Sequence, residues 1–240
     1  MKKSLFIVTL IFASVVVAEA SSLFWGQIVK GNGKVTKENR SVNSFQGVSA
    51  SAGINVYLFA GDEEKVIVET DENLQDCLIT KVKGNTLECY FDCNIRKSTK
   101  TNVYVTYRKI NHIHASSGSN VTGETPIKAQ ELEIKANSAA DIKAEVYANT
   151  IECYVASGAD VELDGKASHF KGRADSGADL KAQDLTAETA DVNSSSGANI
   201  QIAVTKSIDA DASSGGNVEY FGKPQNENVH ESSGGDVRRR

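Results

Sequence analysis

Large side chains and proline are scarce in this sequence of 240 residues. It contains only 2 Pro, 1 Met and 1 Trp, and aromatic residues make up 7% of the chain. Aromatic rings normally supply much of the buried area of a globular core, so this core must be built from small side chains. Because 40% of the residues are hydrophobic and 24% are charged, the composition is that of a folded chain rather than a disordered one.

The absence of a basic surplus and of a second long apolar run excludes whole classes of function. The 26 basic and 31 acidic side chains give a net charge of -5, whereas a nucleic-acid-binding protein needs a basic face to neutralise phosphates. No apolar run after the first twenty residues approaches the roughly 20 residues that a bilayer-spanning helix needs, so we expect no membrane span in the mature chain. We find no set of residues that is typical of a catalytic centre.

The first twenty residues have the pattern of an export signal. Lys2 and Lys3 precede an apolar run at 5–18, and Ala18-Glu19-Ala20 forms a small-x-small cleavage site. We therefore predict a signal peptide over 1–20, a short lead over 21–30, and a location in the periplasm, on the outer-membrane surface or outside the cell. An uncleaved N-terminal anchor is the alternative.

A six-residue motif recurs seven times in the C-terminal half, at steps of 18 to 21 residues. The copies are SSGSNV (116–121), NSAADI (137–142), ASGADV (156–161), DSGADL (175–180), SSGANI (195–200), SSGGNV (213–218) and SSGGDV (232–237). Six copies contain a Ser-Gly pair, to which we assign a structural role in the repeat. These pairs are Ser117 and Gly118, Ser157 and Gly158, Ser176 and Gly177, Ser196 and Gly197, Ser214 and Gly215, and Ser233 and Gly234.

Apolar and polar residues alternate within each repeat, which is typical of a strand with one buried face. A repeat this short can bury that face only against the next copy. The pattern predicts an all-β fold, a right-handed parallel β-helix with coils of about 19 residues, as one domain over 31–240. We expect regular repeats from about 111 and a less regular N-terminal part. The general handedness of parallel crossovers favours the right-handed coil, and the drifting steps argue against a left-handed helix built on regular hexads.

Each motif residue has an expected local role. Glycine permits a bend at low steric cost, and Asn or Asp tolerates turn geometry. By its place in the alternation, the serine is expected to point inward and to form a hydrogen-bonded ladder from coil to coil. An earlier copy, SAGINV at 51–56, lies 65 residues upstream of the first regular one, and this gap is long enough for about three degenerate coils.

The chain has four cysteines, Cys77, Cys89, Cys93 and Cys153. On one strand Cys89 and Cys93 would lie roughly 13 Å apart, which is too far for a disulfide, whereas Cys77 could pair with either of them. Cys153 falls in an inward apolar column, so we interpret it as a small buried hydrophobic residue. The spacing matches no zinc-binding pattern, and we expect no metal site here.

The N-terminal half contains candidate strands at 48–50, 54–59, 65–69, 86–91 and 102–107, and a short helical turn is expected within 71–79. The order of the blocks GNGKV, RSVNSFQGVSASAGINVYL, KVIVETDENL, KGNTLECYF and NVYVTYRKINHIHASSGSNV resembles the family of putative autotransporter adhesins with a head GIN domain, and 53–55 spells Gly-Ile-Asn. The resemblance extends from about residue 31 to the C-terminus. It implies a right-handed β-helix-like fold, an extracytoplasmic location and a binding or adhesive role, and it brings no catalytic residues with it.

An acidic column is the first candidate site. Asp141, Asp160 and Asp179 recur at the same motif position, and Asn120, Asn199 and Asn217 occupy it in other copies. Carboxylates stacked about 4.8 Å apart could bind Ca²⁺ through oxygen or form an acidic catalytic face. The alternative, which we favour, is that they are solvated turn residues. The neighbouring Lys143, Glu162 and Lys181 alternate in sign and predict a charge ladder between coils.

Histidines and aromatic residues offer two further candidates. His112 and His114 share a strand face, but no third metal ligand is evident near them, so we interpret them as ordinary exposed residues. Tyr147, Tyr154 and Phe170 are the only aromatic residues between 116 and 219. Because the alternation turns Phe170 inward, a long aromatic sugar-binding groove is disfavoured. A cluster of Tyr90, Tyr104 and Tyr107 could be a surface patch or could pack under the first coils.

These observations favour an exported, non-enzymatic binding or adhesin-like β-helix protein of the bacterial envelope or surface. Its expected partner is a protein or a polysaccharide that the sequence does not identify. No cofactor is expected, and Ca²⁺ at the acidic column is the only candidate. The alternatives are a β-helical polysaccharide lyase or hydrolase that uses the acidic face and a structural protein of the envelope.

Overall fold

The computed structural model describes residues 28–240, and this part of the chain is almost entirely β-structure. The predicted signal peptide, and the predicted lead up to residue 27, lie outside the described residues. The 3-10 turn η1 (Glu72–Leu74) lies inside the stretch where a short helical turn is expected. No helix in the described part is long and apolar enough to cross a bilayer.

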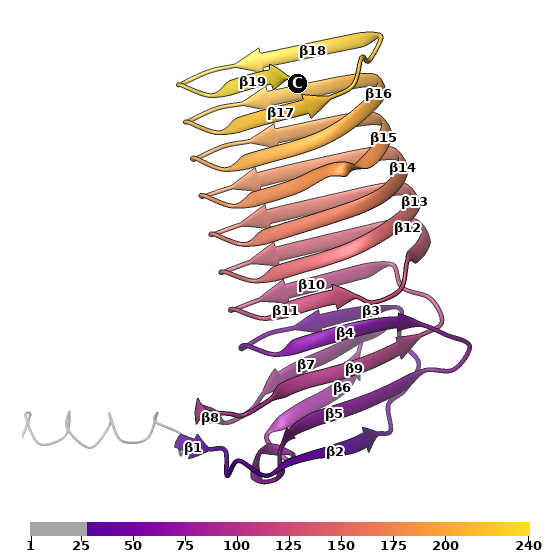
Figure 1. Cartoon of the computed structure of the whole chain (residues 1–240), viewed down its shortest axis with the longest axis vertical. Helices are drawn as coiled ribbons and strands as arrows, with labels where there is room; N and C mark the ends of the chain where they lie inside the picture. Colours follow the sequence, from indigo (N-terminus) through magenta and orange to yellow (C-terminus); the bar gives the residue numbers. More distant parts are fainter. Residues whose placement is uncertain (1–27) are drawn as a thin grey trace, which may run out of the picture.

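Residues 112–240 form a right-handed solenoid of stacked parallel coils (Figure 1). The near strands run from left to right and the far strands return as the chain climbs toward its C-terminus. Each coil leaves a tight turn, crosses the near or front sheet, bends, and returns through the far or back sheet. The strands are β10 (His112–Ser116), β11 (Asn120–Gly123), β12 (Ile127–Asn137), β13 (Asp141–Ala156), β14 (Asp160–Asp175), β15 (Asp179–Ser194), β16 (Asn199–Ala212), β17 (Asn217–Phe221), β18 (Asn226–Glu231) and β19 (Asp236–Arg239). The predicted fold, with coils of about 19 residues, is confirmed.

Equivalent residues of successive coils lie opposite one another, so the apolar positions form columns inside the solenoid. Ile142 lies opposite Val161, which lies opposite Leu180, and the column continues through Ile200 and Val218. All five side chains are buried. The interior is a narrow stack of aliphatic residues and alanines, which explains the low aromatic content.

The Ser-Gly pair occupies the turn itself rather than the interior. Ser157 and Gly158 have φ values of 56° and 67°, and the Ala159 N–H bonds to the Ala156 carbonyl at 3.3 Å, as in a two-residue turn of the type I′ kind. The expectation of an inward serine ladder is wrong, because the chain reverses at this position and the motif serines are exposed. The residue after the glycine, such as Ala159, points inward in their place.

The 65-residue gap before the regular repeats does not contain three coils. β3 (Gly47–Ala50) and β4 (Asn55–Ala60) pair directly with β10 and β11, so the early motif copy is the immediate neighbour of the first regular one. Beneath it lies one coil, formed by β7 (Thr86–Phe91) and β9 (Thr101–Tyr107). The rest of the gap forms antiparallel strands, because the Gly84-Asn85 turn, with φ values of 55° and 67°, folds the chain back into a hairpin.

Antiparallel strands cover the N-terminal end of the solenoid. β5 (Lys65–Asp71) pairs with β9 and with β2 (Val35–Arg40), which extends the front sheet. β6 (Leu78–Lys83) pairs with β7 and extends the back sheet. A short parallel pair, β1 (Ile28–Lys30) and β8 (Asn94–Lys97), lies at the side where the turns are (Figure 1).

Candidate functional site

A ladder of Asn and Asp side chains runs along the front sheet, directly after the turns. Asn120 Nδ2 donates to Asn55 Oδ1 at 2.8 Å, and Asn217 Nδ2 donates to Asn199 Oδ1 at 3.0 Å. Asn102 lies outside every motif copy and joins the ladder only because β4 pairs with β9. In spatial order the ladder consists of Asn102, Asn55, Asn120, Asp141, Asp160, Asp179, Asn199, Asn217 and Asp236.

The three aspartates of the candidate calcium site occupy three successive coils of this ladder. Lys181 Nζ lies 3.0 Å from Asp160 Oδ1, and Asn199 Nδ2 donates to Asp179 Oδ1 at 2.7 Å, so two of the carboxylates have protein partners. Among the described residues, the metal-ligating atoms of Asp141, Asp160 and Asp179 do not all come within 4.8 Å of one another. Calcium binding by this column stays the less favoured alternative to solvated turn residues.

The predicted charge ladder next to the Asn/Asp column forms only in part, because Lys181 pairs with Asp160 and not with Glu162. Lys143 Nζ lies 2.5 Å from Glu162 Oε1, and Arg240 lies 2.6 Å from Glu219. A shallow groove of about 450 Å³ lies between the two ladders near the C-terminal end, and its polar lining includes Asn199, Asn217 and Glu219. The groups in this groove largely bind one another, which makes it a stable polar surface.

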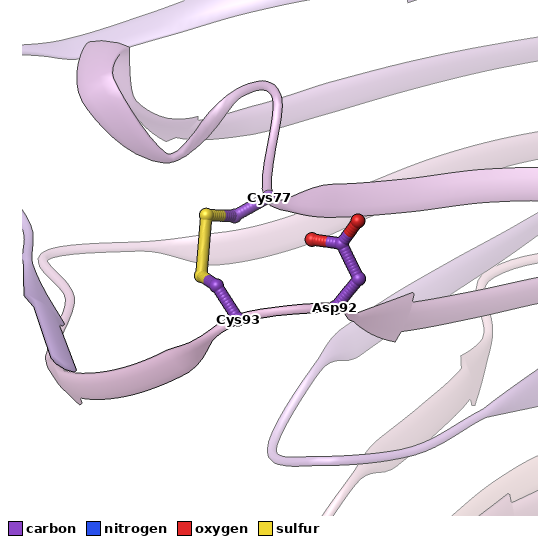
Figure 2. Close-up of side chains that lie close together, drawn as sticks. All are labelled: Cys77, Asp92 and Cys93. Carbon is purple, nitrogen blue, oxygen red and sulfur yellow. A yellow bond between two sulfur atoms is a disulfide. The ribbon is translucent and has the colours of Figure 1, made fainter. Parts of the chain in front are cut away.

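The disulfide joins Cys77, before β6, to Cys93, after β7 (Figure 2). The antiparallel pairing of β6 and β7 brings Cys77 opposite Asp92, whose N–H bonds to the Cys77 carbonyl at 3.1 Å. Cys89 instead points into the core, where burial raises the pKa of its thiol to about 12. Cys77, Asp92 and Cys93 have metal-ligating atoms within 4.8 Å of one another, but both sulfurs are used in the disulfide.

Cys153 is also free and buried, as predicted. Burial raises the pKa of its thiol far above the ordinary value. A thiol held in this protonated form is a poor nucleophile and a poor metal ligand, so Cys153 belongs to the core and not to a reactive site.

The two histidines lie on the back sheet beside a carboxylate that the sequence did not place there. His114 Nε2 lies 2.7 Å from Glu133 Oε1, and Glu133 comes from the next coil, opposite His112 in register. Lys135 Nζ is 2.6 Å from the other oxygen of Glu133, and this hydrogen bond is the main reason why the pKa of Glu133 is lowered. His112 lies 2.7 Å from Thr86 Oγ1. Glu133 therefore contacts both His114 and Lys135, and the cluster does not present an open coordination site.

The three tyrosines near the N-terminus do not form one surface patch, and of the three only Tyr107 packs in the core beneath the first coils. Tyr107 is buried with 3% exposure, and Tyr90 lies under Lys81 Nζ, which is 4.9 Å from its ring centre. Tyr104 stacks instead on Tyr57, at 5.2 Å between ring centres. Tyr57 and Tyr104 are far apart in the sequence, and only the pairing of β4 with β9 brings them opposite each other.

Two adjoining grooves follow the bend that joins the front and back sheets. One has a volume of about 720 Å³ and the other about 570 Å³, and they share Ala129, Gln130 and Tyr147 as lining residues. Tyr147 is 39% exposed, with Lys128 opposite it in the preceding coil and Lys166 in the following coil. Lys128, Tyr147 and Lys166 follow one another at steps of 19 residues, so the repeat spacing already aligns them, but only the folded bend places this column in a groove.

Comparison with known proteins gives a family and a set of related folds. The model of the family described as "Putative auto-transporter adhesin, head GIN domain" matches residues 44–224. No curated protein matches the chain.

Three solved structures have the same fold. A putative adhesin from Bacteroides fragilis has a TM-score of 0.83 and 19% identity over 88% of this chain and 100% of its own. A putative adhesin from Parabacteroides distasonis has a TM-score of 0.72 and 20% identity over 89% of this chain and 100% of its own. A putative lipid binding protein from the same species has a TM-score of 0.70 and 17% identity over 89% of this chain and 100% of its own. At these identities the likeness establishes the fold.

Proposed function

This chain belongs to the family of putative auto-transporter adhesins with a head GIN domain, and from that premise we propose that it is an exported, non-enzymatic binding protein of the bacterial envelope. The pattern of residues 1–20 supports export. The Cys77–Cys93 disulfide supports it independently, because disulfides persist in oxidising compartments outside the cytoplasm.

The observation that carries the proposal is the pair of adjoining grooves along the bend. They extend across several coils, from Lys128 in β12 to Thr205 in β16. A surface built on hydrogen-bonded ladders is rigid, so a long ligand can bind without the cost of ordering a loop. An elongated, shallow and rigid surface suits an extended polymer or the face of another macromolecule.

The front-sheet carboxylates support binding more than catalysis. An acid–base pair needs one carboxyl group held protonated beside one that is ionised, across a cleft. Asp160 is paired with Lys181, and Asp179 accepts a hydrogen bond from Asn199. Both carboxylates therefore already have partners in a neighbouring coil, and these contacts stabilise the stack. If the protein were instead a polysaccharide lyase or hydrolase, it would cleave the bound glycan.

The test is retention of the full chain on immobilised glycans and on bacterial and host cells, with chemical analysis of the glycans afterwards. We expect saturable binding without shortened or unsaturated products, and the variant Asp160→Asn should bind like the parent protein. Product formation that Asp160→Asn abolishes would favour the polysaccharide lyase or hydrolase. Absence of saturable binding to every glycan and cell type would favour a structural role in the envelope.

A further inference from the structure

A column of Lys128, Tyr147 and Lys166 runs along the grooves at the bend. Lys128 lies opposite Tyr147 in the register of β12 and β13, and Tyr147 lies opposite Lys166 in the register of β13 and β14. Consecutive strands are about 4.8 Å apart, so the two lysine backbones are separated by roughly 10 Å with the tyrosine ring between them. All three side chains are exposed or partly exposed.

The positive charge of this column contrasts with the surface around it. Residues 111–240 contain 12 basic and 20 acidic side chains. Several lysines there are neutralised, such as Lys143 by Glu162 and Lys181 by Asp160. Lys128 and Lys166 form no ion pair with any described residue.

The other charged residues in the grooves do not neutralise Lys128 and Lys166. Lys109 also lines the larger groove and forms no ion pair with the described residues, while Glu131 is the acidic residue there. In the smaller groove Glu188 is neutralised by Lys206 Nζ at 2.6 Å. The grooves thus offer unpaired cations on a protein whose net charge is -5, and a ligand of complementary charge would be anionic.

Small residues and the ring of Tyr147 form the floor of the smaller groove. Ala129, Ala148 and Ala167 lie opposite one another in successive coils and line the smaller groove beside Tyr147. The Tyr147 hydroxyl donates to Glu145 Oε1 at 2.7 Å, which orients the ring. A flat ligand can lie on the alanines against the ring, because no large side chain projects from these positions.

Resting on the proposed binding function, we infer that these grooves bind an extended acidic polysaccharide of the polyuronate class. A sugar ring packs on Tyr147, and carboxylates on the sugars at either side bind Lys128 and Lys166. A tyrosine between two cations matches a chain in which rings and carboxylates alternate, whereas a neutral glycan would leave the lysines unused.

The test measures binding of the full chain to polygalacturonate and alginate in low salt by calorimetry. Lys128→Gln/Lys166→Gln should weaken binding at least about tenfold, because two charge-assisted contacts are lost. Tyr147→Ala should weaken it about fivefold, and Tyr147→Phe should weaken it less, because it keeps the ring and loses only the hydrogen bond to Glu145. Rising salt should weaken the parent and have less effect on the double variant. The matched control is Lys65→Gln/Lys171→Gln, which removes two exposed lysines elsewhere, and thermal unfolding establishes that each variant is folded.

Several outcomes would overturn the inference. Equal losses in both double variants would show a nonspecific charge effect. Binding of poly-glutamate as tight as that of the polyuronates, and insensitive to Tyr147→Ala, would show that no sugar ring is recognised. Preference for phosphatidylglycerol vesicles or for a neutral galactan would assign the grooves to another ligand. If polyuronates do not bind but other glycans or cells retain the protein, the inference fails while the proposed function stands.

Discussion

At the scale of single residues, the backbone of the repeat turn depends on two positions in the left-handed region. Glycine adopts this conformation without steric cost, and other residues pay about 1–2 kcal/mol. Ala139 occupies the glycine position of one copy with a φ of 58°, so the turn tolerates a methyl group there. A strained glycine inside a strand is a different case, because a neighbouring backbone fills the space.

Gly165 and Gly158 provide a matched pair for this difference. A Cβ at Gly165, where φ is 113°, would approach the carbonyl oxygen of Val146 to 2.1 Å, while a Cβ at Gly158 would meet no atom within 4 Å. We expect Gly165→Ala to lower the free energy of unfolding by about 2–4 kcal/mol and Gly158→Ala by about 1 kcal/mol. Urea unfolding measures both, and equal losses would contradict the argument.

Glu69 is a buried carboxylate whose stabilising effect depends on pH. Burial by itself would raise its pKa, but hydrogen bonds from Tyr104 at 2.8 Å, Lys100 at 3.1 Å and Asn102 at 3.2 Å outweigh burial and lower the pKa to about 2. A folded-state pKa below the unfolded value gives stability that is fully present above about pH 4.5 and is lost as the pH falls toward 2.

The variant Glu69→Gln should therefore be less stable than the parent by about 1–3 kcal/mol at pH 7. The difference should shrink steadily between pH 5 and pH 2, because the parent carboxylate becomes protonated. Chemical unfolding at a series of pH values provides the measurement. A difference that stays constant over this range would mean that the charge of Glu69 does not stabilise the fold.

At the scale of strands, packing between neighbouring positions explains residues that break the repeat. Gly172 stands in the apolar column of Ile134, Cys153 and Val192. A Cβ at this position would come within 2.7 Å of the Phe170 ring, and Phe170 is itself buried with 2% exposure. The glycine leaves room for the Phe170 ring inside the solenoid.

This packing predicts that the two positions are coupled. Gly172→Ala should cost about 1–3 kcal/mol through overpacking, and Phe170→Leu should cost a similar amount through lost contacts. The loss of unfolding free energy in the double variant should be about 1 kcal/mol smaller than the sum of the two single losses, because leucine makes room for the added methyl group. A double-mutant cycle from thermal or urea unfolding tests this, and simple additivity would contradict it.

The disulfide stabilises the strands of the N-terminal cap. It closes a loop with a sequence separation of 16 residues, for which loss of the cross-link should cost about 3 kcal/mol. We expect Cys77→Ser/Cys93→Ser to lower the free energy of unfolding by that amount. Cys89→Ser should lower the free energy of unfolding for a different reason, because it buries a hydroxyl group in the core. In the folded, oxidised parent, a thiol reagent should label neither Cys89 nor Cys153, and rapid labelling of either would contradict their burial.

At the scale of the whole molecule, stability should vary along the axis. Each coil contacts mainly its neighbours, so opening can begin at an end and spread from there. Antiparallel strands cover the N-terminal end, whereas every residue of β18 is exposed. The central coils, from β13 to β15, are covered on both sides.

Native-state hydrogen exchange should follow this gradient. Amides of β18 and β19 should exchange at least about 100-fold faster than those of β13 to β15, since opening the last coil exposes little buried surface. Peptide-resolved mass spectrometry provides the measurement. Uniform protection along the axis would indicate that the solenoid unfolds as one unit.

Much of the solenoid could be predicted from local patterns. The alternation in each repeat determines which side chains are buried, because successive residues of a strand point to opposite faces. Val161, Leu180, Phe170 and Cys153 all lie inside as expected. The motif serines, such as Ser157, were misplaced because alternation has no meaning across a turn in which the chain reverses.

The candidate site could be predicted only in part. Asp141, Asp160 and Asp179 form a column because their place in the repeat is fixed by the turn directly before them. Lys128, Tyr147 and Lys166 also recur at steps of 19 residues, so the repeat spacing already places them in one column. That this column lines a groove follows from the shape of the bend in each coil, which the repeat spacing does not show.

The sequence by itself determined the repeat, the buried face of each strand and the family, since all three depend on residues close together in the chain. The tertiary structure alone decided that one coil lies out of sequence order beneath β3 and β4, that Cys77 pairs with Cys93, and that the column of Lys128, Tyr147 and Lys166 lines grooves at the bend. These features depend on strands that pair out of sequence order, on antiparallel pairing and on the shape of the bend. Their partners are therefore selected by hydrogen-bonded register and by packing, which a local pattern does not contain.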